Sequence, residues 1–187
     1  MKILFFDVET TGLSSYKNGI HQLAGLIDID NVTKETFNIK IKPDPKLEID
    51  PEALKVSNTT LEQLNSYPEE SVSFKTFQDL LDKYVDRYNP DDKFFLCGYN
   101  NIRFDNEFLR KFFSRNGENY FGSYFWSNTL DMMALATPVL MEKRHKMENF
   151  KLSSVAKMLS INLSEDKLHD ALYDVYLTKE VYNLILT

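Results

Sequence analysis

Four acidic residues and one histidine hold the chemistry that this sequence could perform, and they are Asp7, Glu9, Asp105, His169 and Asp174. They lie in three short segments: FDVETTGL near the start, GYNNIRFDNEFL in the middle and HDALYDVYLTKEVY near the end. A fold that gathers four carboxylates in one crevice must neutralise them, and divalent metal ions do this well. A neutral imidazole nearby can take a proton from a water molecule. Together these groups are suited to the hydrolysis of a phosphodiester bond.

The first acidic pair, Asp7 and Glu9, stands two residues apart on a predicted strand, so both side chains project to one face. Two carboxylates on one face of a buried strand are unfavourable unless they are paired or bind metal. The spacing alone is equally consistent with a strand end that begins a turn. The following Thr10-Thr11-Gly12 favours a binding site, because small hydroxyls and a glycine let backbone N–H groups approach an anion.

The middle acid, Asp105, follows Phe104 at the start of a predicted helix. Acids near a helix N-terminus are common for structural reasons, since the helix dipole favours them. However, this position lies just beyond the carboxyl end of an inner strand, where open α/β sheets bind ligands. Asn100 and Asn101 add amides that can hydrogen-bond a sugar or a phosphate.

The last segment offers three candidates: His169, Asp170 and Asp174. Asp170 and Asp174 are four residues apart on a predicted helix and share a face. We expect Asp170 to cap the helix. His169 has an ordinary pKa of about 6.5, which suits a general base near neutral pH.

The remaining cationic and metal-binding signals are weaker. His21 and His145 have no acids at ligand spacing, and no His/Cys cluster predicts zinc. The basic cluster Lys143, Arg144, His145, Lys146 and Lys151 is typical of a solvated loop, although it could also hold phosphates beside His169.

The composition indicates one globular domain spanning residues 1–187, with 43% hydrophobic and 27% charged residues. The net charge of −6 argues against a protein that coats long duplexes, because phosphate contacts need basic residues. The lone Cys97 cannot form an intrachain disulfide, and no apolar stretch approaches the roughly 18 residues of a membrane span. No signal-peptide core precedes Asp7. We therefore expect a cytoplasmic protein with no membrane association.

The elements that must position these residues follow from hydrophobic periodicity and turn signals. Strands are predicted at Lys2–Val8, Ile20–Ile29, Thr36–Ile41, Lys93–Tyr99 and Trp126–Leu130, with a hairpin turn at Asp30-Asn31. Residues 43–52 are expected to be irregular. A short helix through Leu64 is predicted, with Thr59 or Thr60 as its cap. Further helices are predicted at Ser71–Tyr88, at Phe104–Asn116, from Asp131, at Leu152–Leu159 and at Asp170–Leu186, with a loop at Met141–Lys151. Strands that come first and then alternate with helices predict a mixed α/β sheet.

Taken together, the three segments resemble the three motifs of the DEDDh (DnaQ-like) 3′–5′ exonucleases, a family that includes the proofreading subunit of bacterial replicative DNA polymerase. Asp7 and Glu9 stand in the first motif and Asp105 in the second. In the third, His169 stands five residues before Asp174, which matches the histidine branch of the family rather than the tyrosine branch.

The resemblance implies an RNase H-like fold, a five-stranded mixed sheet flanked by helices. It also implies that the four acids hold two Mg²⁺ or Mn²⁺ ions while His169 takes a proton from the attacking water. The residues expected to receive the terminal nucleotide are Thr10, Thr11, Gly12, Leu13, Asn100 and Phe104, with Leu13 against the base.

The chain departs from the family at two places that touch substrate. Relatives often have histidine where this chain has Tyr99, and a His-Gly pair in the region of Ser57-Asn58. Both departures leave the metal ligands intact and bear on the choice of base, sugar or strand. The chain ends soon after the last helix, so we expect a free-standing nuclease, and association with a polymerase stays open.

The resemblance thus predicts a two-metal-ion 3′–5′ exonuclease that releases 5′-mononucleotides from single-stranded ends, with DNA favoured over RNA. An exoribonuclease resembling oligoribonuclease is the near alternative. A catalytically silent module that binds nucleic acid or a partner protein is the more distant one. The presence of all four acids and the histidine speaks against this last alternative.

Overall fold

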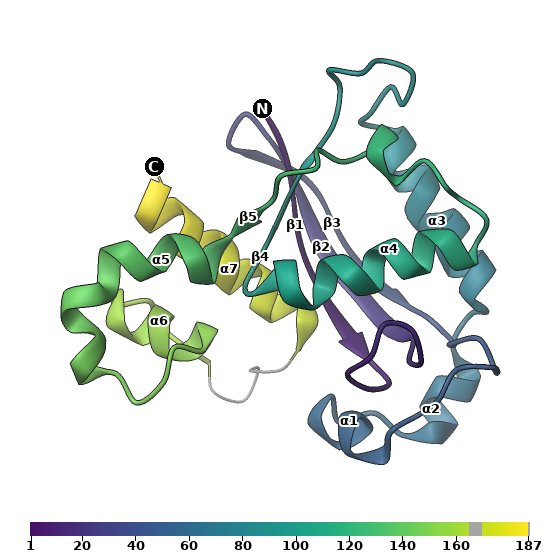
Figure 1. Cartoon of the computed structure of the whole chain (residues 1–187), viewed down its shortest axis with the longest axis horizontal. Helices are drawn as coiled ribbons and strands as arrows, with labels where there is room; N and C mark the ends of the chain where they lie inside the picture. The colour runs from purple at the N-terminus through teal and green to yellow at the C-terminus, as the bar shows by residue number, and fades with distance from the viewer. Residues whose placement is uncertain (165–169, 187) are drawn as a thin grey trace.

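Five strands form one mixed sheet in the computed structural model of this chain, in the order β3-β2-β1-β4-β5 (Figure 1). The structure describes residues 1–164 and 170–186. The strands are β1 (Lys2–Thr10), β2 (Ile20–Ile29), β3 (Val32–Lys40), β4 (Phe95–Gly98) and β5 (Leu130–Asp131). β2 pairs antiparallel with both β1 and β3, whereas β4 pairs parallel with both β1 and β5. The predicted α/β fold with a five-stranded mixed sheet is confirmed.

The hairpin between β2 and β3 depends on two residues in the left-handed region. Asp30 has φ 54° and Asn31 has φ 64°, a conformation that Asp and Asn tolerate and that suits a two-residue turn. This tight turn lets β3 begin at Val32, four residues before the predicted start at Thr36. The prediction was late because the first residues of β3 are exposed and show no apolar alternation.

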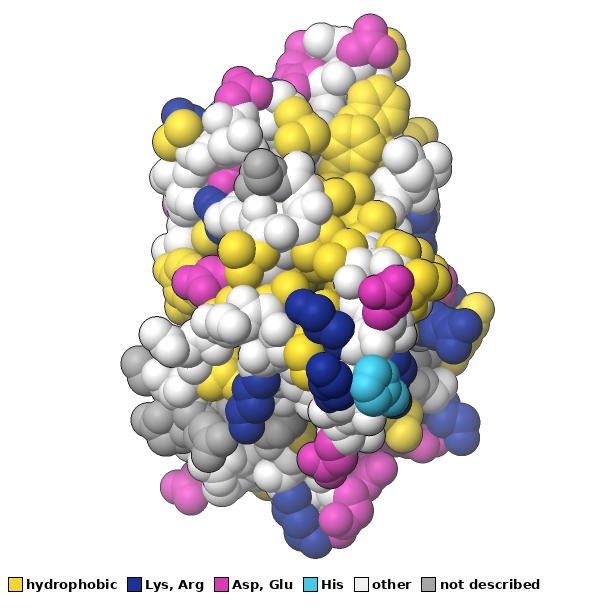
Figure 2. All heavy atoms as spheres, turned by 90° about the vertical axis from the view of Figure 1, so that its left-hand side faces the viewer, with side chains coloured by type: hydrophobic (Ala, Val, Ile, Leu, Met, Phe, Trp, Pro, Cys, Tyr) yellow, Lys and Arg dark blue, Asp and Glu magenta, His cyan; other side chains and the backbone are white. Residues whose placement is uncertain are grey.

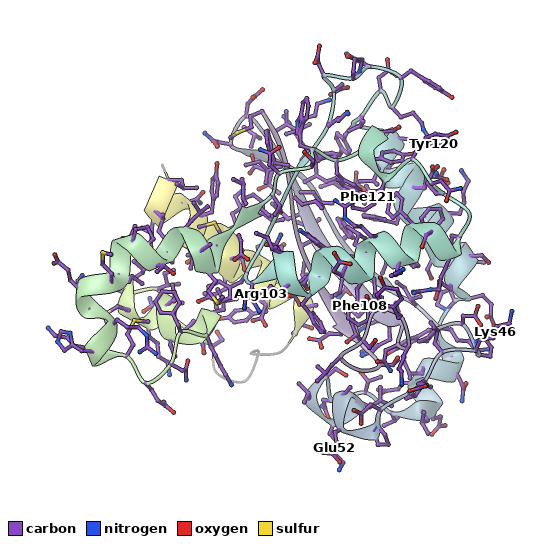
Figure 3. All side chains as sticks on the ribbon, in the orientation of Figure 1. Lys46, Glu52, Arg103, Phe108, Tyr120 and Phe121 are labelled. Carbon is purple, nitrogen blue, oxygen red and sulfur yellow. The ribbon has the colours of Figure 1, made fainter. Side chains whose placement is uncertain are left out.

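Helices α3 (Glu70–Asp82) and α4 (Asp105–Arg115) cover one face of the sheet. Their aromatic residues build the core there, with the fully buried Phe113 edge-on to Phe74, Phe77 and Phe121. Figure 3 shows Phe108 and Phe121 turned inward and Tyr120 turned outward. The prediction that α3 continues to Tyr88 was wrong. Val85 still packs on this core although the helix ends before it, which explains the misleading apolar pattern.

Helices α5 (Met132–Leu140), α6 (Leu152–Met158) and α7 (Ala171–Leu186) cover the opposite face. Their apolar side chains pack against Ile3, Phe5 and Leu26 of the sheet. The ring of Phe5 meets that of Tyr182 in α7 edge-on, with centroids 5.2 Å apart. None of the helices among the described residues is long and apolar enough to cross a membrane.

Two short helices, α1 (Pro51–Val56) and α2 (Leu61–Ser66), lie near the carboxyl end of β1 in Figure 1. The expectation that residues 43–52 are irregular was wrong for Pro51 and Glu52, which begin α1. Pro51 occupies the first turn of α1, where a missing N–H costs nothing, and Asp50 caps the helix. The predicted cap of α2 is confirmed, because Thr60 forms a capping box with Gln63.

The remaining differences concern short elements. The predicted loop at Met141–Lys151 contains a 3₁₀ helix, η3 (Met141–Lys146), and further 3₁₀ turns are η1 (Asn101–Arg103) and η2 (Phe121–Ser123). The strands β4 and β5 are shorter than predicted, because the flanking aromatic residues Phe94 and Phe125 pair only in an isolated bridge that is not continuous with the two strands.

Candidate active site

The alternation of β1 carries Asp7 and Glu9 to the face of the sheet that α7 covers. Ile3 and Phe5 pack on that face, and side chains two residues apart on a strand share a face. The acids therefore continue the apolar row of Ile3 and Phe5 at the carboxyl end of the strand. There the packing of hydrocarbon against α7 gives way to carboxylates.

Asp105, the first residue of α4, is buried and joins the second segment to the first. Its Oδ1 accepts a hydrogen bond from the Val8 backbone N–H at 3.2 Å. Val8 lies between the two acids of β1, so this bond fixes the start of α4 beside them.

The third segment contributes the first turn of α7. Asp174 stands in that turn, and the Asp170 Oδ1 accepts a hydrogen bond from the Tyr173 N–H at 3.0 Å. This bond confirms the predicted helix-capping role of Asp170. The predicted general base, His169, lies outside the described residues.

The acids of the three segments act on one another electrostatically. Burial raises the pKa of Asp7 well above its ordinary value, and the charges of Asp105 and Glu9 raise it further. Burial likewise raises the pKa of Glu9 to about 7, with contributions from Asp174 and then Asp105. Acids that are distant in sequence therefore influence one another at the end of β1, and Asp7, Glu9, Asp105 and Asp174 are called the acidic group below.

A fifth acid, Asp131, stands at the carboxyl end of β5 and was not singled out from the sequence. It is buried and accepts hydrogen bonds from the N–H groups of Asn100 (2.9 Å) and Met133 (3.0 Å), so it caps α5 and fixes the turn after β4. Burial is the main cause that raises the pKa of Asp105 to about 7, and the charge of Asp131 contributes to the rise, whereas the hydrogen bond from the Val8 N–H opposes it. An acid at a strand-to-helix junction was the signal that could have indicated it.

The donor set fits hard divalent cations such as Mg²⁺ or Mn²⁺. Carboxylate oxygens are the ligands that these ions prefer, and a cation would offset the burial and the neighbouring charges of Asp174 and Asp105 that raise the pKa of Glu9. Within residues 1–164 and 170–186, no three His, Cys, Asp or Glu side chains already stand together as a metal-binding group. The fit therefore depends on donor chemistry and charge.

Comparison with known proteins agrees with this chemistry. Residues 4–182 match the RNase T exonuclease family. The chain belongs to this family of exonucleases. The predicted relationship to the DEDDh exonucleases and the RNase H-like fold are thereby confirmed. No match was found among curated protein sequences.

Solved structures of E. coli exonuclease I share the fold. Its complex with a dT13 oligonucleotide is 24% identical, with a TM-score of 0.77 over 100% of this chain and 41% of that one. Its complex with a dA16 oligonucleotide is also 24% identical, with a TM-score of 0.78 over 98% of this chain and 40% of that one. The chain thus spans about two fifths of the length of exonuclease I.

The loop after β1 is held by its own side chains. The Thr11 hydroxyl donates to the Glu48 carbonyl at 2.9 Å and accepts from the Gly19 N–H at 3.0 Å, and Thr10 Oγ1 donates to the Gly12 carbonyl at 2.7 Å. A Cβ on Gly12 would lie 2.5 Å from the Asn18 side chain, so only glycine fits. The next residue, Leu13, is 84% exposed.

The turn after β4 carries the other predicted substrate contacts. Asn100 adopts φ 61°, which its bond to Asp131 stabilises, and Phe104 packs against Phe108 with centroids 4.8 Å apart. The hydroxyl of Tyr99, where the family resemblance leads us to expect histidine, donates a hydrogen bond to the Phe150 carbonyl. This hydroxyl therefore joins β4 to the segment before α6.

Ser57 and Asn58, in the region where the family resemblance leads us to expect a His-Gly pair, follow the end of α1. Asn58 adopts φ 49°, a left-handed conformation that glycine also favours. The Ser57 hydroxyl lies 3.1 Å from Nε2 of His21, a fully buried residue of β2. Burial lowers the pKa of His21 to about 4, so the imidazole is neutral at pH 7.

The basic cluster lies mainly on η3, where Lys143, Arg144, His145 and Lys146 are all exposed. Figure 2 shows Lys and Arg side chains grouped around a histidine on the face formed by α5, η3 and α6. Arg144 donates to the Met147 carbonyl at 2.8 Å, so it stabilises the end of η3.

Proposed function

We propose that this exonuclease is metal-dependent and removes 5′-mononucleotides from the 3′ ends of single-stranded nucleic acid, with DNA preferred over RNA. The observation that carries the proposal is the placement of acids from separate segments at the end of β1, where Asp7 and Glu9 share one face of the strand and Asp105 is bonded to the Val8 N–H between them. Such an arrangement is unfavourable for a fold and is typical of a site that binds cations.

Each residue has a role in this proposal. Asp7, Glu9, Asp105 and Asp174 hold two Mg²⁺ or Mn²⁺ ions. When bound, these ions supply Lewis-acid stabilisation of the phosphate and make water a better nucleophile. The imidazole of His169 accepts the proton of the attacking water. In-line attack at the terminal phosphodiester releases a 5′-mononucleotide and leaves a new 3′-OH.

The terminal nucleotide is proposed to lie on the loop after β1. Leu13 presents an exposed apolar side chain there, and Gly12 lets the Asn18 side chain pack closely against the loop. Stacking of a base on an apolar or aromatic surface contributes about 1–3 kcal/mol and needs no sequence readout. Thr10, Thr11, Asn100 and Phe104 would complete the pocket. An unpaired end can enter such a site, whereas a duplex cannot.

The preference for DNA draws support from the oligonucleotides bound to E. coli exonuclease I, dT13 and dA16. The second candidate is a 3′–5′ exoribonuclease, which is favoured by the name of the RNase T family. The substitutions at Tyr99 and at Ser57-Asn58 bear on this choice, because relatives have substrate-contacting residues there.

The test uses DNA and RNA strands of one sequence, labelled at the 5′ end and incubated with Mg²⁺ or Mn²⁺. We expect a ladder that shortens from the 3′ end, faster for DNA, and no shortening in EDTA. A silent module would shorten neither strand. If EDTA makes no difference, the metal-dependent proposal fails. Circular dichroism in EDTA separates a catalytic metal from a structural one, because only removal of a structural metal unfolds the protein.

A further inference from the structure

A row of polar residues leads from the acidic group to the edge of the sheet. Glu9 of β1 pairs with Gln22 of β2, and Gln22 pairs with Lys40 of β3. Residues opposite each other on neighbouring strands share a face, and neighbouring strands lie about 4.8 Å apart. Lys40 therefore lies on the face of Glu9, about 10 Å away across two strands.

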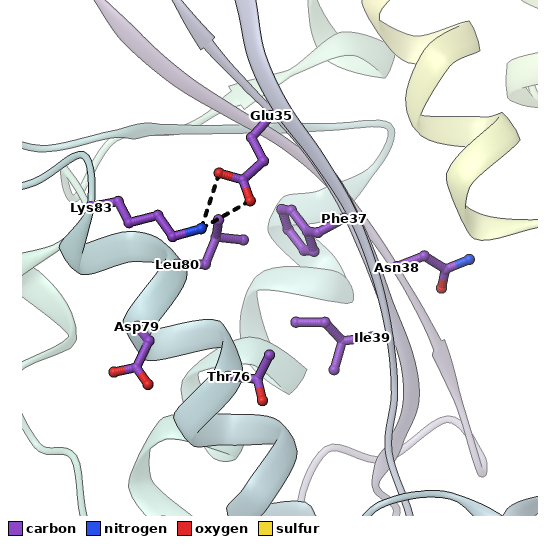
Figure 4. Close-up of a pocket in the computed structure, with 8 residues that line it drawn as sticks. All are labelled: Glu35, Phe37, Asn38, Ile39, Thr76, Asp79, Leu80 and Lys83. Atoms are coloured by element: carbon purple, nitrogen blue, oxygen red, sulfur yellow. Dashed lines mark hydrogen bonds and ion pairs between the residues drawn. The ribbon is translucent and has the colours of Figure 1, made fainter.

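Asn38 belongs to the same face, because it is two residues from Lys40 on β3. Figure 4 shows Asn38 turned away from Phe37 and Ile39, which point toward α3. The Asn38 Oδ1 accepts a hydrogen bond from the Gln22 amide at 3.1 Å. Its own NH₂ group is exposed and has no acceptor among the described residues, so it can donate to an anion.

The position of Lys40 is fixed by contacts that leave the charge of its ammonium unneutralised. The Lys40 carbonyl accepts a hydrogen bond from the Ser73 hydroxyl at 2.9 Å, and the ammonium lies 5.8 Å from the ring centroid of Tyr67. No described carboxylate forms an ion pair with it. By contrast, Lys42 pairs with Glu69 at 2.8 Å.

The charge of Lys40 is felt at the acidic group without an ion pair. Lys40 lowers the pKa of Glu9, against the effect of burial. Two divalent ions would balance the four proposed carboxylate ligands, so the phosphates of a bound strand would need further positive charge. Lys40 is a cation on the same face, held within reach of a strand that leaves the acidic group.

We propose that the Lys40 ammonium and the Asn38 amide form a phosphate-binding subsite for a phosphodiester of the substrate strand upstream of the scissile one. This inference rests on the proposed function for the direction in which the strand runs. The subsite fixes how far the strand reaches across β2 and β3, and it favours substrates of more than one nucleotide.

The test measures binding rather than turnover. A short fluorescent oligothymidylate is titrated with wild-type protein and variants by anisotropy, with Ca²⁺ in place of Mg²⁺, and its integrity is checked on a gel. We expect Lys40→Met to raise Kd about fivefold to tenfold, and Lys40→Arg to stay near wild type. The slope of log Kd against log salt should fall by about 0.7 in Lys40→Met, as for one lost phosphate contact on a single strand.

Lys34→Met is the matched control, because it removes the same charge from the other end of β3, where Lys34 forms no ion pair with a described carboxylate. It should leave Kd and slope unchanged. A set of oligonucleotides with one neutral methylphosphonate linkage at successive positions then locates the contact. At one upstream linkage, the loss caused by Lys40→Met should disappear.

The inference is overturned if Lys40→Met and Lys34→Met behave alike, or if the Lys40→Met loss is the same at every linkage. If the wild type shortens DNA normally and Lys40→Met binds like wild type, the subsite is refuted and the proposed function stays intact. A Lys40-dependent affinity without any hydrolysis in Mg²⁺ supports the subsite and refutes the proposed function. Absence of binding to the wild type refutes both.

Discussion

The two faces of strand β1 make opposite contributions to the fold. On one face, Leu4, Phe6 and Val8 are buried in the aromatic core under α3 and α4. On the other, Ile3 and Phe5 pack under α7, and the row then ends in two acids. Apolar burial stabilises the fold, whereas crowded carboxylates destabilise it. The difference indicates that the acidic end is retained for chemistry and that the aromatic face supplies the stability to tolerate it.

The largest expected effect comes from removing a proposed metal ligand on the α7 side. Asp174→Ala should lower the rate by about 10³-fold or more. The variant should bind the proposed metal ions less well, and their positive charge would stabilise the reacting phosphate. The melting temperature should stay near that of wild type. Rate measurement on labelled DNA and a thermal melt check both statements.

Asp170→Ala is the matched control, because it removes an acid four residues away in the same helical region. Its cap on the Tyr173 N–H should make it cost about 1 kcal/mol of stability, with little loss of rate. A larger loss of rate in Asp170→Ala than in Asp174→Ala would show that the wrong acid was assigned.

A substitution on the aromatic face should have the reverse outcome. Phe113→Ala removes a fully buried ring that contacts several aromatic neighbours and should cost about 3–5 kcal/mol of unfolding free energy. The rate per folded molecule should be unchanged. Urea unfolding measures the free energy of unfolding. Titration with a tightly binding oligonucleotide counts the folded molecules, so that the rate per folded molecule can be calculated. A rate loss that exceeds the unfolded fraction would mean that the faces are not independent.

Much of the fold follows from local patterns in the sequence. β2 was predicted with its observed bounds, because a long apolar run between turn residues has few alternatives. A helix capped at Thr59 or Thr60 was predicted because threonine favours that position, and the structure has Thr60 as the cap. α1 was missed because Pro51 can either break a helix or begin one. The hydrogen bond that the Asp50 side chain accepts from the Glu52 N–H shows that a helix begins here.

The acidic site was partly visible in the same way. Asp7 and Glu9 share a face by strand alternation alone, and motif spacing indicated Asp105 and Asp174. Lys40 was not visible, because its proximity to Glu9 depends on the register of three strands. Register between distant strands is a tertiary property that local periodicity does not contain.

The electrostatic cost of the acidic face can be measured at Glu9. Its pKa is raised from 4.5 to about 7 in the folded protein, so the folded state holds a proton that the unfolded state releases. Stability should therefore fall as pH rises from about 4.5 to 7 in the absence of metal. At pH 8 in EDTA, Glu9→Gln should unfold at a higher urea concentration than wild type. The free energy of unfolding should be higher by about 1–3 kcal/mol after allowance for solvent screening.

The pH dependence provides the control for this prediction. Near pH 4 both side chains are neutral, so the advantage of Glu9→Gln should disappear. Mg²⁺ at pH 8 should raise the stability of wild type and do little for the variant, which lacks a proposed ligand. An advantage that is equal at both pH values would point to packing rather than charge.

The smallest expected effect concerns Tyr99, which lies on the same side as the acids but is bonded within the protein. Tyr99→Phe removes the hydroxyl that donates to the Phe150 carbonyl and should cost about 0.5–1.5 kcal/mol of stability. Tyr120→Phe, at a side chain that is 70% exposed, should cost nothing. The KM for DNA should be unchanged in both variants, as measured by steady-state kinetics. A KM that rises only in Tyr99→Phe would show that this position contacts substrate, as in relatives with histidine there, and would extend the functional face to the end of β4.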